Sequence, residues 1–84
     1  MAYKAALTKN FLREFKKLPD HIKDGISRAI DEIVANPFSG VKLRGELEGR
    51  WRWRVGKYRI IYLIDQTPKL VVLLDVGLRK TIYK

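Results

Sequence analysis

The feature that most constrains this chain is residues 50–55, where arginine alternates with large apolar side chains. The even positions hold Arg50, Arg52 and Arg54, and the odd positions hold Trp51, Trp53 and Val55. Successive side chains of a strand point to opposite faces of a sheet, so this alternation predicts a strand with one apolar and one cationic face. We expect the two tryptophans to be largely buried against a helix and the arginines to form the outer surface of the sheet.

Periodicity and helix breakers predict the N-terminal elements. A weak alternation indicates a short first strand within residues 2–7, and Thr8 or Asn10 can cap the helix that follows. Pro19 ends this helix, and Asp20 is the expected N-cap of a second helix that the Asn36-Pro37 pair stops. The apolar stripe of the second helix consists of Ile22, Ile26, Ala29, Ile30, Ile33 and Val34.

The second half of the chain changes from helical periodicity to strand patterns. Residues 38–49 contain three glycines and no strong period, so we expect a loop from which Leu43 and Leu47 reach the core. Residues 56–57, a Gly-Lys pair, predict a tight turn into a strand over 58–64.

A second turn over 65–69 then leads into an apolar run over 70–76, which suits a central strand. The predicted fold class is α+β. We expect a short N-terminal strand and a two-helix hairpin packed on an antiparallel sheet of three to four strands, in a single domain that spans residues 1–84.

Composition excludes several classes of function. The chain has no cysteine and only one histidine, His21, which rules out disulfides, thiolate catalysis and zinc-finger-type sites. No segment approaches the roughly 20 apolar residues of a membrane span. We therefore expect a soluble, cytoplasmic domain with no metal, no cofactor and no membrane partner.

Positive charge is concentrated in the second half. Residues 1–40 carry seven Lys or Arg against five acids, whereas residues 41–84 carry eleven against four, a net of 11 − 4 = +7 out of a total of +9. Such a surface attracts polyphosphate, an acidic protein or anionic lipid, in that order, although a merely solvated strand face is the alternative. The candidate RNA-binding residues are Arg44, Arg50, Lys57 and Lys80.

The side-chain groups of the usual hydrolases are missing. A single histidine allows no Ser/His/acid set, and the scattered glycines form no phosphate-binding loop. Arginine, lysine and tyrosine suit one metal-free reaction, the cleavage of RNA by its own 2′-hydroxyl, because fixed guanidinium groups stabilise the charge on the phosphate. These groups titrate far from neutral pH, so such an enzyme should depend on substrate positioning.

Several motifs together resemble the RelE/ParE toxin superfamily over nearly the whole chain. They are Phe15-Lys-Lys-Leu18, Asn36-Pro37, Lys42-Leu-Arg-Gly45, Trp51-Arg-Trp-Arg-Val55, Lys57-Tyr-Arg-Ile-Ile-Tyr62 and Val76-Gly-Leu-Arg79 through Tyr83. The resemblance implies a RelE-like fold and, for the RelE branch, a toxin of a type II toxin-antitoxin system that cleaves mRNA in the ribosomal A site. It also implies a cognate acidic, RelB-like antitoxin that holds the toxin in a hetero-oligomer.

The same resemblance implies a catalytic set, position by position. The set consists of Arg52, Arg54, Arg59, Arg79 and Tyr83. Tyr83 would help to activate the 2′-hydroxyl, Arg59 and Arg79 would bind the phosphate and assist departure of the 5′-oxygen, and Arg52 and Arg54 would neutralise charge. Alternatives stay open: Tyr83 as a packed terminal aromatic, and Arg59 paired with Asp75 across the sheet. Two other functions also stay open, inhibition of DNA gyrase by a ParE-like binder and a non-catalytic nucleic-acid binding module.

Overall fold

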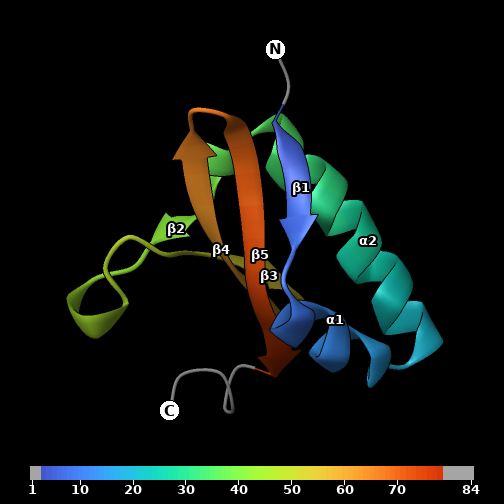
Figure 1. Ribbon diagram of the computed structural model, residues 1–84. Helices are drawn as coiled ribbons and strands as arrows, with labels where there is room; N and C mark the ends of the chain where they lie inside the picture. The colour runs from blue at the N-terminus through green and yellow to red at the C-terminus, as the bar shows by residue number, and fades with distance from the viewer. Residues whose placement is uncertain (1–2, 79–84) are drawn as a thin grey trace.

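The structure, a computed structural model, describes residues 3–78 of the chain. Two helices, α1 (Lys9–Lys16) and α2 (Asp20–Ala35), pack on a five-stranded sheet. The strands are β1 (Lys4–Leu7), β2 (Val41–Lys42), β3 (Trp51–Val55), β4 (Tyr58–Gln66) and β5 (Lys69–Leu78). Figure 1 shows both helices on one side of the sheet and the segment between β2 and β3 projecting from the other. The predicted α+β class is confirmed.

The sheet is mixed rather than purely antiparallel. Its strand order is β1-β5-β4-β3-β2, and all neighbours are antiparallel except β1 and β5, which run parallel. The sequence predicts three to four antiparallel strands. The structure has five, because it includes the two-residue β2, and β1 is parallel to β5 rather than antiparallel. A parallel pair needs a long crossover connection. The chain provides one because β1 and β5 lie at opposite ends of the sequence.

The two helices are stabilised at their N-termini in different ways, α1 by a side-chain cap and α2 by an acidic residue in its first turn. The Thr8 hydroxyl accepts a hydrogen bond from the Phe11 N–H at 3.1 Å and caps α1, as predicted. The same hydroxyl donates to the Leu73 carbonyl at 2.8 Å, which ties the start of α1 to β5. The prediction of Asp20 as a cap is wrong, because Pro19 holds the cap position and Asp20 is the first helical residue. A carboxylate is favourable there, at the positive end of the helix dipole. Within residues 3–78, neither helix is long and apolar enough to cross a membrane.

The core lies between the helices and the sheet. Its fully buried side chains are Phe11, Ile26, Ile33, Ile60, Tyr62, Val71, Leu73 and Val76. Trp51 and Trp53 lie on this face, directly opposite Tyr62 and Ile60 of β4, and they pack against the core while staying partly exposed. The predicted orientation of the β3 side chains is confirmed. The tryptophans are not fully buried because only the two-residue β2 lies outside β3.

The chain between α2 and β3 is irregular, as the glycines predict, but it is not a plain loop. Two 3-10 turns, Pro37–Ser39 and Gly45–Leu47, flank β2. Leu43 is buried and Leu47 is partly buried, which confirms that this segment contributes apolar contacts. The first turn contacts the helix side of the sheet through Pro37, whereas Leu47 and Arg50 lie beside Ile61 and Asp75 on the opposite face.

Candidate nucleic-acid interface

The face of the sheet opposite the helices carries the arginines of β3 and β4. Residues directly opposite each other on antiparallel strands share a face. From β3 through β4 to β5, two cross-strand rows on this face are Arg52, Ile61, Asp75 and Arg54, Arg59, Gly77. Arg50 precedes β3 by one residue and lines a cavity together with Ile61 and Asp75, which places it beside the first row. We call Arg50, Arg52, Arg54 and Arg59 the arginine face.

Arg54 and Arg59 lie directly opposite each other on β3 and β4. Residues at such positions have Cβ atoms about 4.5–5.5 Å apart, and like charges there destabilise a sheet. Arg54 is exposed, whereas Arg59 is only 4% exposed, and arginine keeps its charge even when buried. The pair therefore concentrates positive charge at one place on the sheet, which favours the binding of an anion.

Arg52 lies on the same face, two residues before Arg54 in β3. Its cross-strand neighbours are Val41 of β2 and Ile61 of β4, and its side chain is partly buried. The Nε atom of Arg52 is buried and has no hydrogen-bond partner among residues 3–78. A buried donor without a partner costs about 1–3 kcal/mol. Arg52 is thus held between β2 and β4 at the cost of one buried donor without a partner among the described residues.

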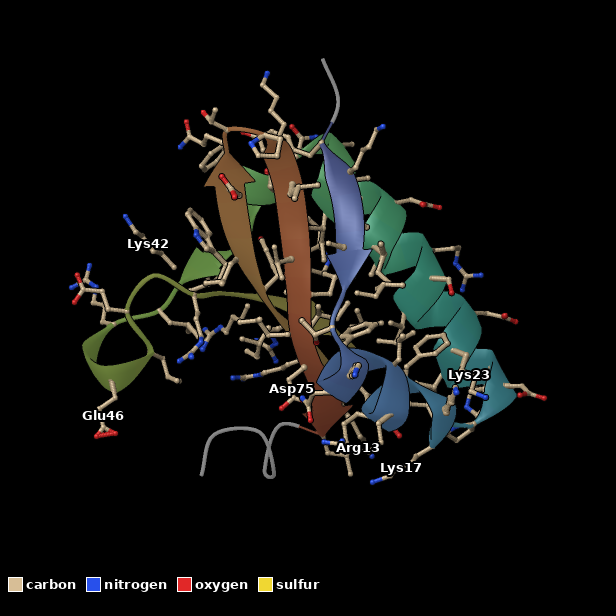
Figure 2. The ribbon with its side chains drawn as sticks, viewed as in Figure 1. Arg13, Lys17, Lys23, Lys42, Glu46 and Asp75 are labelled. Carbon is tan, nitrogen blue, oxygen red and sulfur yellow. The ribbon has the colours of Figure 1, made fainter. Side chains whose placement is uncertain are left out.

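A cavity of about 250 Å³ opens beside the arginine face. Its lining residues are Asn10, Leu47, Arg50, Ile61, Leu74 and Asp75. On the α1 side, the amide of Asn10 donates to the Leu74 carbonyl at 2.9 Å and fixes that wall. Figure 2 shows Asp75 at the end of β5 nearest α1. The cavity therefore combines apolar walls with a carboxylate and a guanidinium.

The opposite wall of this cavity comes from the segment between β2 and β3. Gly45 and Gly49 have φ of 72° and 93°, a left-handed conformation that glycine adopts readily. The Arg50 N–H donates to the Leu47 carbonyl at 3.0 Å, which closes the turn and aligns these two residues. Glu46 lies at the outer tip of the segment, away from the sheet (Figure 2). The segment thus presents Leu47 and Arg50 to the cavity and Glu46 to solvent.

A second cavity, of about 340 Å³, lies at the edge of the sheet where β2 begins. Its lining residues are Ser39, Gly40, Val41, Arg52, Trp53 and Arg54. In the described part of the chain, β2 pairs only with Trp51 and Arg52, so the rest of β3 is an open edge. The arginine face therefore continues around this edge into a hollow bounded by Arg52 and Arg54.

The other predicted RNA-binding residues are more scattered. Arg44 is exposed and shares a shallow cavity with Lys42 and Glu48. Lys57 is exposed in the β3–β4 turn, where it lines a groove with His21 of α2. The structure therefore places Lys57 toward the helix side and does not bring it together with the arginine face. Arg79, Lys80 and Tyr83 lie outside the described residues.

Asp75 and Asn10 are residues of this region that sequence reasoning missed. The sequence suggests Asp75 only as a possible ion-pair partner of Arg59, and it suggests Asn10 only as a possible helix cap. A signal for Asp75 was available, because it is the one charged residue in the apolar run 70–76. No comparable signal marks Asn10, whose position depends on how α1 packs against β5.

Tyr62 does not contribute an acid or base to the arginine face. It lies on the helix side of β4, and burial raises its pKa to about 12, although a hydrogen bond with the backbone of Gly40 offsets part of this rise. A tyrosine with so high a pKa stays protonated at neutral pH. The described part of the face can bind a phosphate and stabilise negative charge on it.

The family of this chain is established by its similarity to known proteins. Residues 5–83 match the family described as the ParE toxin of the type II toxin-antitoxin system parDE. The chain belongs to the RelE/ParE family of type II toxins. The family to which the sequence motifs point is thus confirmed. The toxin carries the arginine face on the family's common fold.

Individual relatives of the toxin agree with this assignment. It is 35% identical to Toxin RelG of Mycobacterium tuberculosis, with 100% of this chain and 99% of the relative covered. Toxin RelE of the same organism is 30% identical, with coverage of 98% and 87%. The crystal structure of a RelBE toxin-antitoxin complex from that organism matches with a TM-score of 0.88 at 33% identity, covering 94% of this chain and 100% of the other. An archaeal RelE-RelB complex from Pyrococcus horikoshii matches with a TM-score of 0.79 at 25% identity, covering 96% and 99%.

Proposed function

We propose that this toxin is a ribosome-dependent endoribonuclease that cleaves mRNA in the ribosomal A site and so inhibits translation in the cytoplasm. The observation that carries the proposal is the directly opposed pair Arg54 and Arg59, with Arg52 on the same face. Alternate residues of a strand are about 6.6–6.8 Å apart, close to the spacing of successive phosphates on a stretched RNA strand. Arginine suits this role because its planar guanidinium contacts phosphate through two donors.

The proposed reaction uses the RNA as its own nucleophile. The 2′-oxygen loses its proton and attacks the adjacent phosphorus, the bond to the 5′-oxygen breaks, and that oxygen takes up a proton. The products are a 2′,3′-cyclic phosphate and a 5′-hydroxyl. Negative charge builds up on the phosphate as the reaction proceeds, and fixed guanidinium groups of Arg52, Arg54 and Arg59 stabilise it. This step requires neither a metal ion nor an activated water molecule.

Two residues outside the described part of the chain complete the proposed catalytic set. By resemblance to the RelE branch, Tyr83 helps to activate the 2′-hydroxyl, and Arg79 binds the phosphate and assists departure of the 5′-oxygen. Arg44, Arg50, Lys57 and Lys80 are the proposed RNA contacts. Because arginine and tyrosine ordinarily titrate far from pH 7, proton transfer is slow unless the substrate is well placed. This explains why the proposed enzyme depends on mRNA held by the ribosome.

The proposed partner of the toxin is a cognate acidic antitoxin of the RelB type, bound in a hetero-oligomer. Two similar structures are toxin-antitoxin complexes, one from M. tuberculosis and one from P. horikoshii. The net charge of +9 on 84 residues favours association with an anionic chain.

A second candidate function is inhibition of DNA gyrase by binding, without cleavage of any nucleic acid. The matching family is described by the ParE toxin, which favours this reading. The curated relatives at 35% and 30% identity are named RelG and RelE, which favours the RelE branch.

One experiment separates the two candidate functions. RNA ends are mapped after brief expression of the toxin, and purified toxin is added in parallel to a gyrase supercoiling assay. The proposal expects new 5′-hydroxyl ends within translated messages and unchanged supercoiling. Inhibited supercoiling without new RNA ends would establish the gyrase reading instead.

A further inference from the structure

We propose that the 250 Å³ cavity beside the arginine face is a base-binding pocket in which Asp75 and Arg50 select one base of the RNA strand. The inference rests on the proposed cleavage of RNA and adds to it the residues that choose the sequence. The ligand is a nucleobase that presents N–H donors to the carboxylate, and guanine fits best.

The position of the cavity relative to the arginines supports this assignment. Ile61, in the cavity wall, lies directly opposite Arg52 on one side and Asp75 on the other. It is also two residues from Arg59 along β4, a separation of about 6.6–6.8 Å. A nucleotide whose phosphate is bound by Arg52 and Arg59 can therefore place its base in the cavity without leaving this face of the sheet.

The walls of the cavity suit a flat, partly apolar ligand. Leu47, Ile61 and Leu74 provide the apolar surface, and Arg50, Asp75 and Asn10 provide polar groups. Of these, the Asn10 amide already donates to the Leu74 carbonyl. The volume is several times the ~30 Å³ that one water molecule occupies in the liquid, so a group of the size of a nucleobase can enter. Pockets of this kind bind through apolar walls and take their selectivity from a few polar groups.

The presence of Asp75 indicates that the cavity selects a base rather than binds the RNA backbone. A carboxylate repels phosphate, so its place in a cavity beside four arginines weakens general attraction for RNA. It accepts hydrogen bonds only. One oxygen, Oδ1, accepts from the Val76 N–H at 2.9 Å, which orients the carboxylate and does not occupy Oδ2.

The donors and acceptors of the two charged residues match guanine best. Guanine presents two adjacent N–H donors, N1 and N2, to a carboxylate, and its O6 and N7 are the acceptors that arginine contacts most often in specific recognition. Cytosine and adenine each offer a carboxylate one amino group, and uracil offers one ring N–H. Asp75 and Arg50 together therefore favour guanine and disfavour uracil.

The first test measures binding of free nucleotides, which needs no ribosome. GMP, CMP, AMP and UMP are titrated into the 15N-labelled toxin and followed by amide chemical shifts. We expect GMP to bind at least about fivefold more tightly than UMP, with shifts around residues 47, 50, 61 and 75, and Asp75→Asn to bring the two within about twofold. Asparagine retains an acceptor for the Val76 N–H, so the fold should survive this change, and a thermal melt checks it.

The control variant is Asp31→Asn, which makes the same change in net charge on an exposed position of α2. It should leave the ratio of GMP to UMP affinity unchanged. Equal binding of the four nucleotides by the unmodified toxin, or the same ratio in Asp75→Asn, would overturn the pocket. So would an equal effect of both variants, because that outcome assigns the preference to net charge.

The second test maps cleavage positions on ribosomes with the unmodified toxin and with Asp75→Asn. We expect the variant to cleave, and its preference for guanine next to the cut to fall about tenfold. Cleavage by both proteins with one identical sequence profile would overturn the inference and leave the proposed function intact. Absence of cleavage by the unmodified toxin, together with an Asp75-dependent preference for GMP, would overturn the proposed cleavage and uphold the pocket.

Discussion

The Tyr62 hydroxyl donates a hydrogen bond to the Pro37 carbonyl at 2.7 Å, and this bond joins the centre of the sheet to the turn that follows α2. Tyr62 is fully buried on β4, and Pro37 is buried in the first 3-10 turn. The Trp51 ring stacks near Tyr62 with ring centroids 6.4 Å apart. The start of β2 and the open edge of β3, which bounds the second cavity, therefore depend on a buried contact on the helix side.

Stability at high pH should report on this contact. Because the pKa of Tyr62 is raised to about 12 in the folded protein, against about 10 when unfolded, the folded state binds more protons between these values. Its contribution is complete below about pH 10 and is lost as pH rises toward 12. Tyr62→Phe should lower the unfolding free energy at pH 7 by about 1–2 kcal/mol, and the gap to the unmodified protein should narrow from pH 10 upward. Urea unfolding of both proteins between pH 7 and pH 12 measures this difference in unfolding free energy. A difference that stays constant over this range would contradict the raised pKa of Tyr62.

Two glycine substitutions should have opposite effects on stability. At Gly40 an added Cβ would lie 2.8 Å from the Arg52 carbonyl oxygen and would also meet the Tyr62 hydroxyl, so Gly40→Ala should destabilise by roughly 1–3 kcal/mol. At Gly25, within α2, the nearest atom is Val55 Cγ1 at 3.6 Å, an ordinary contact. Gly25→Ala should stabilise by about 0.5–1 kcal/mol, because alanine is the better helix former. If the urea midpoints of both variants move in the same direction, the proposed difference between close packing at Gly40 and an ordinary contact at Gly25 is contradicted.

The charge of Arg54, opposite Arg59, should lower the stability of the fold and contribute to RNA binding. Arg54→Gln removes one of two like charges at directly opposite positions, so the unfolding free energy should rise by about 0.2–1 kcal/mol. The same change should reduce the salt dependence of RNA binding by about one unit of slope. Arg28→Gln, at an exposed position of α2, is the control and should change neither quantity. If Arg54→Gln and Arg28→Gln weaken RNA binding equally, the arginine face is not the binding surface.

Association with the antitoxin should be governed by charge. The net charge of +9 predicts an association rate constant that falls steeply between low and physiological salt, while the dissociation rate changes little. Stopped-flow mixing of toxin and antitoxin at several ionic strengths measures both. An association rate that does not respond to salt would show that the cationic surface takes no part in the encounter.

Local features of the fold could be predicted because short-range chemistry decides them. The Thr8 cap and the predicted turn at residues 56–57 depend on residues within a few positions, and Gly56 has a positive φ of 60° in this turn. The orientation of Trp51 and Trp53 follows from the period of two. In contrast, the parallel pairing of β1 with β5 joins residues more than 60 positions apart, and no local pattern encodes it.

The candidate site could be predicted in part. The alternation places Arg52 and Arg54 on one face, and the structure adds that Arg59 is buried directly opposite Arg54, a register that the turn length sets. The cavity at Asp75 could not be predicted, because it needs α1, β4, β5 and the segment before β3 at once. Only the three-dimensional packing of these four elements brings Asn10, Leu47 and Asp75 together.

The most direct test of the proposed mechanism is single-turnover cleavage of ribosome-bound message with a 2′-deoxy nucleotide at the scissile position. The mechanism predicts that the all-RNA message gives a 2′,3′-cyclic phosphate and a 5′-hydroxyl end, and that the 2′-deoxy message is not cut at that position. In the same assay, Arg59→Ala should lower the cleavage rate far more than Arg28→Ala, because Arg59 belongs to the arginine face and Arg28 lies on α2. Cleavage of the 2′-deoxy message at an undiminished rate would contradict the mechanism, since the nucleophile could not then be the sugar of the substrate.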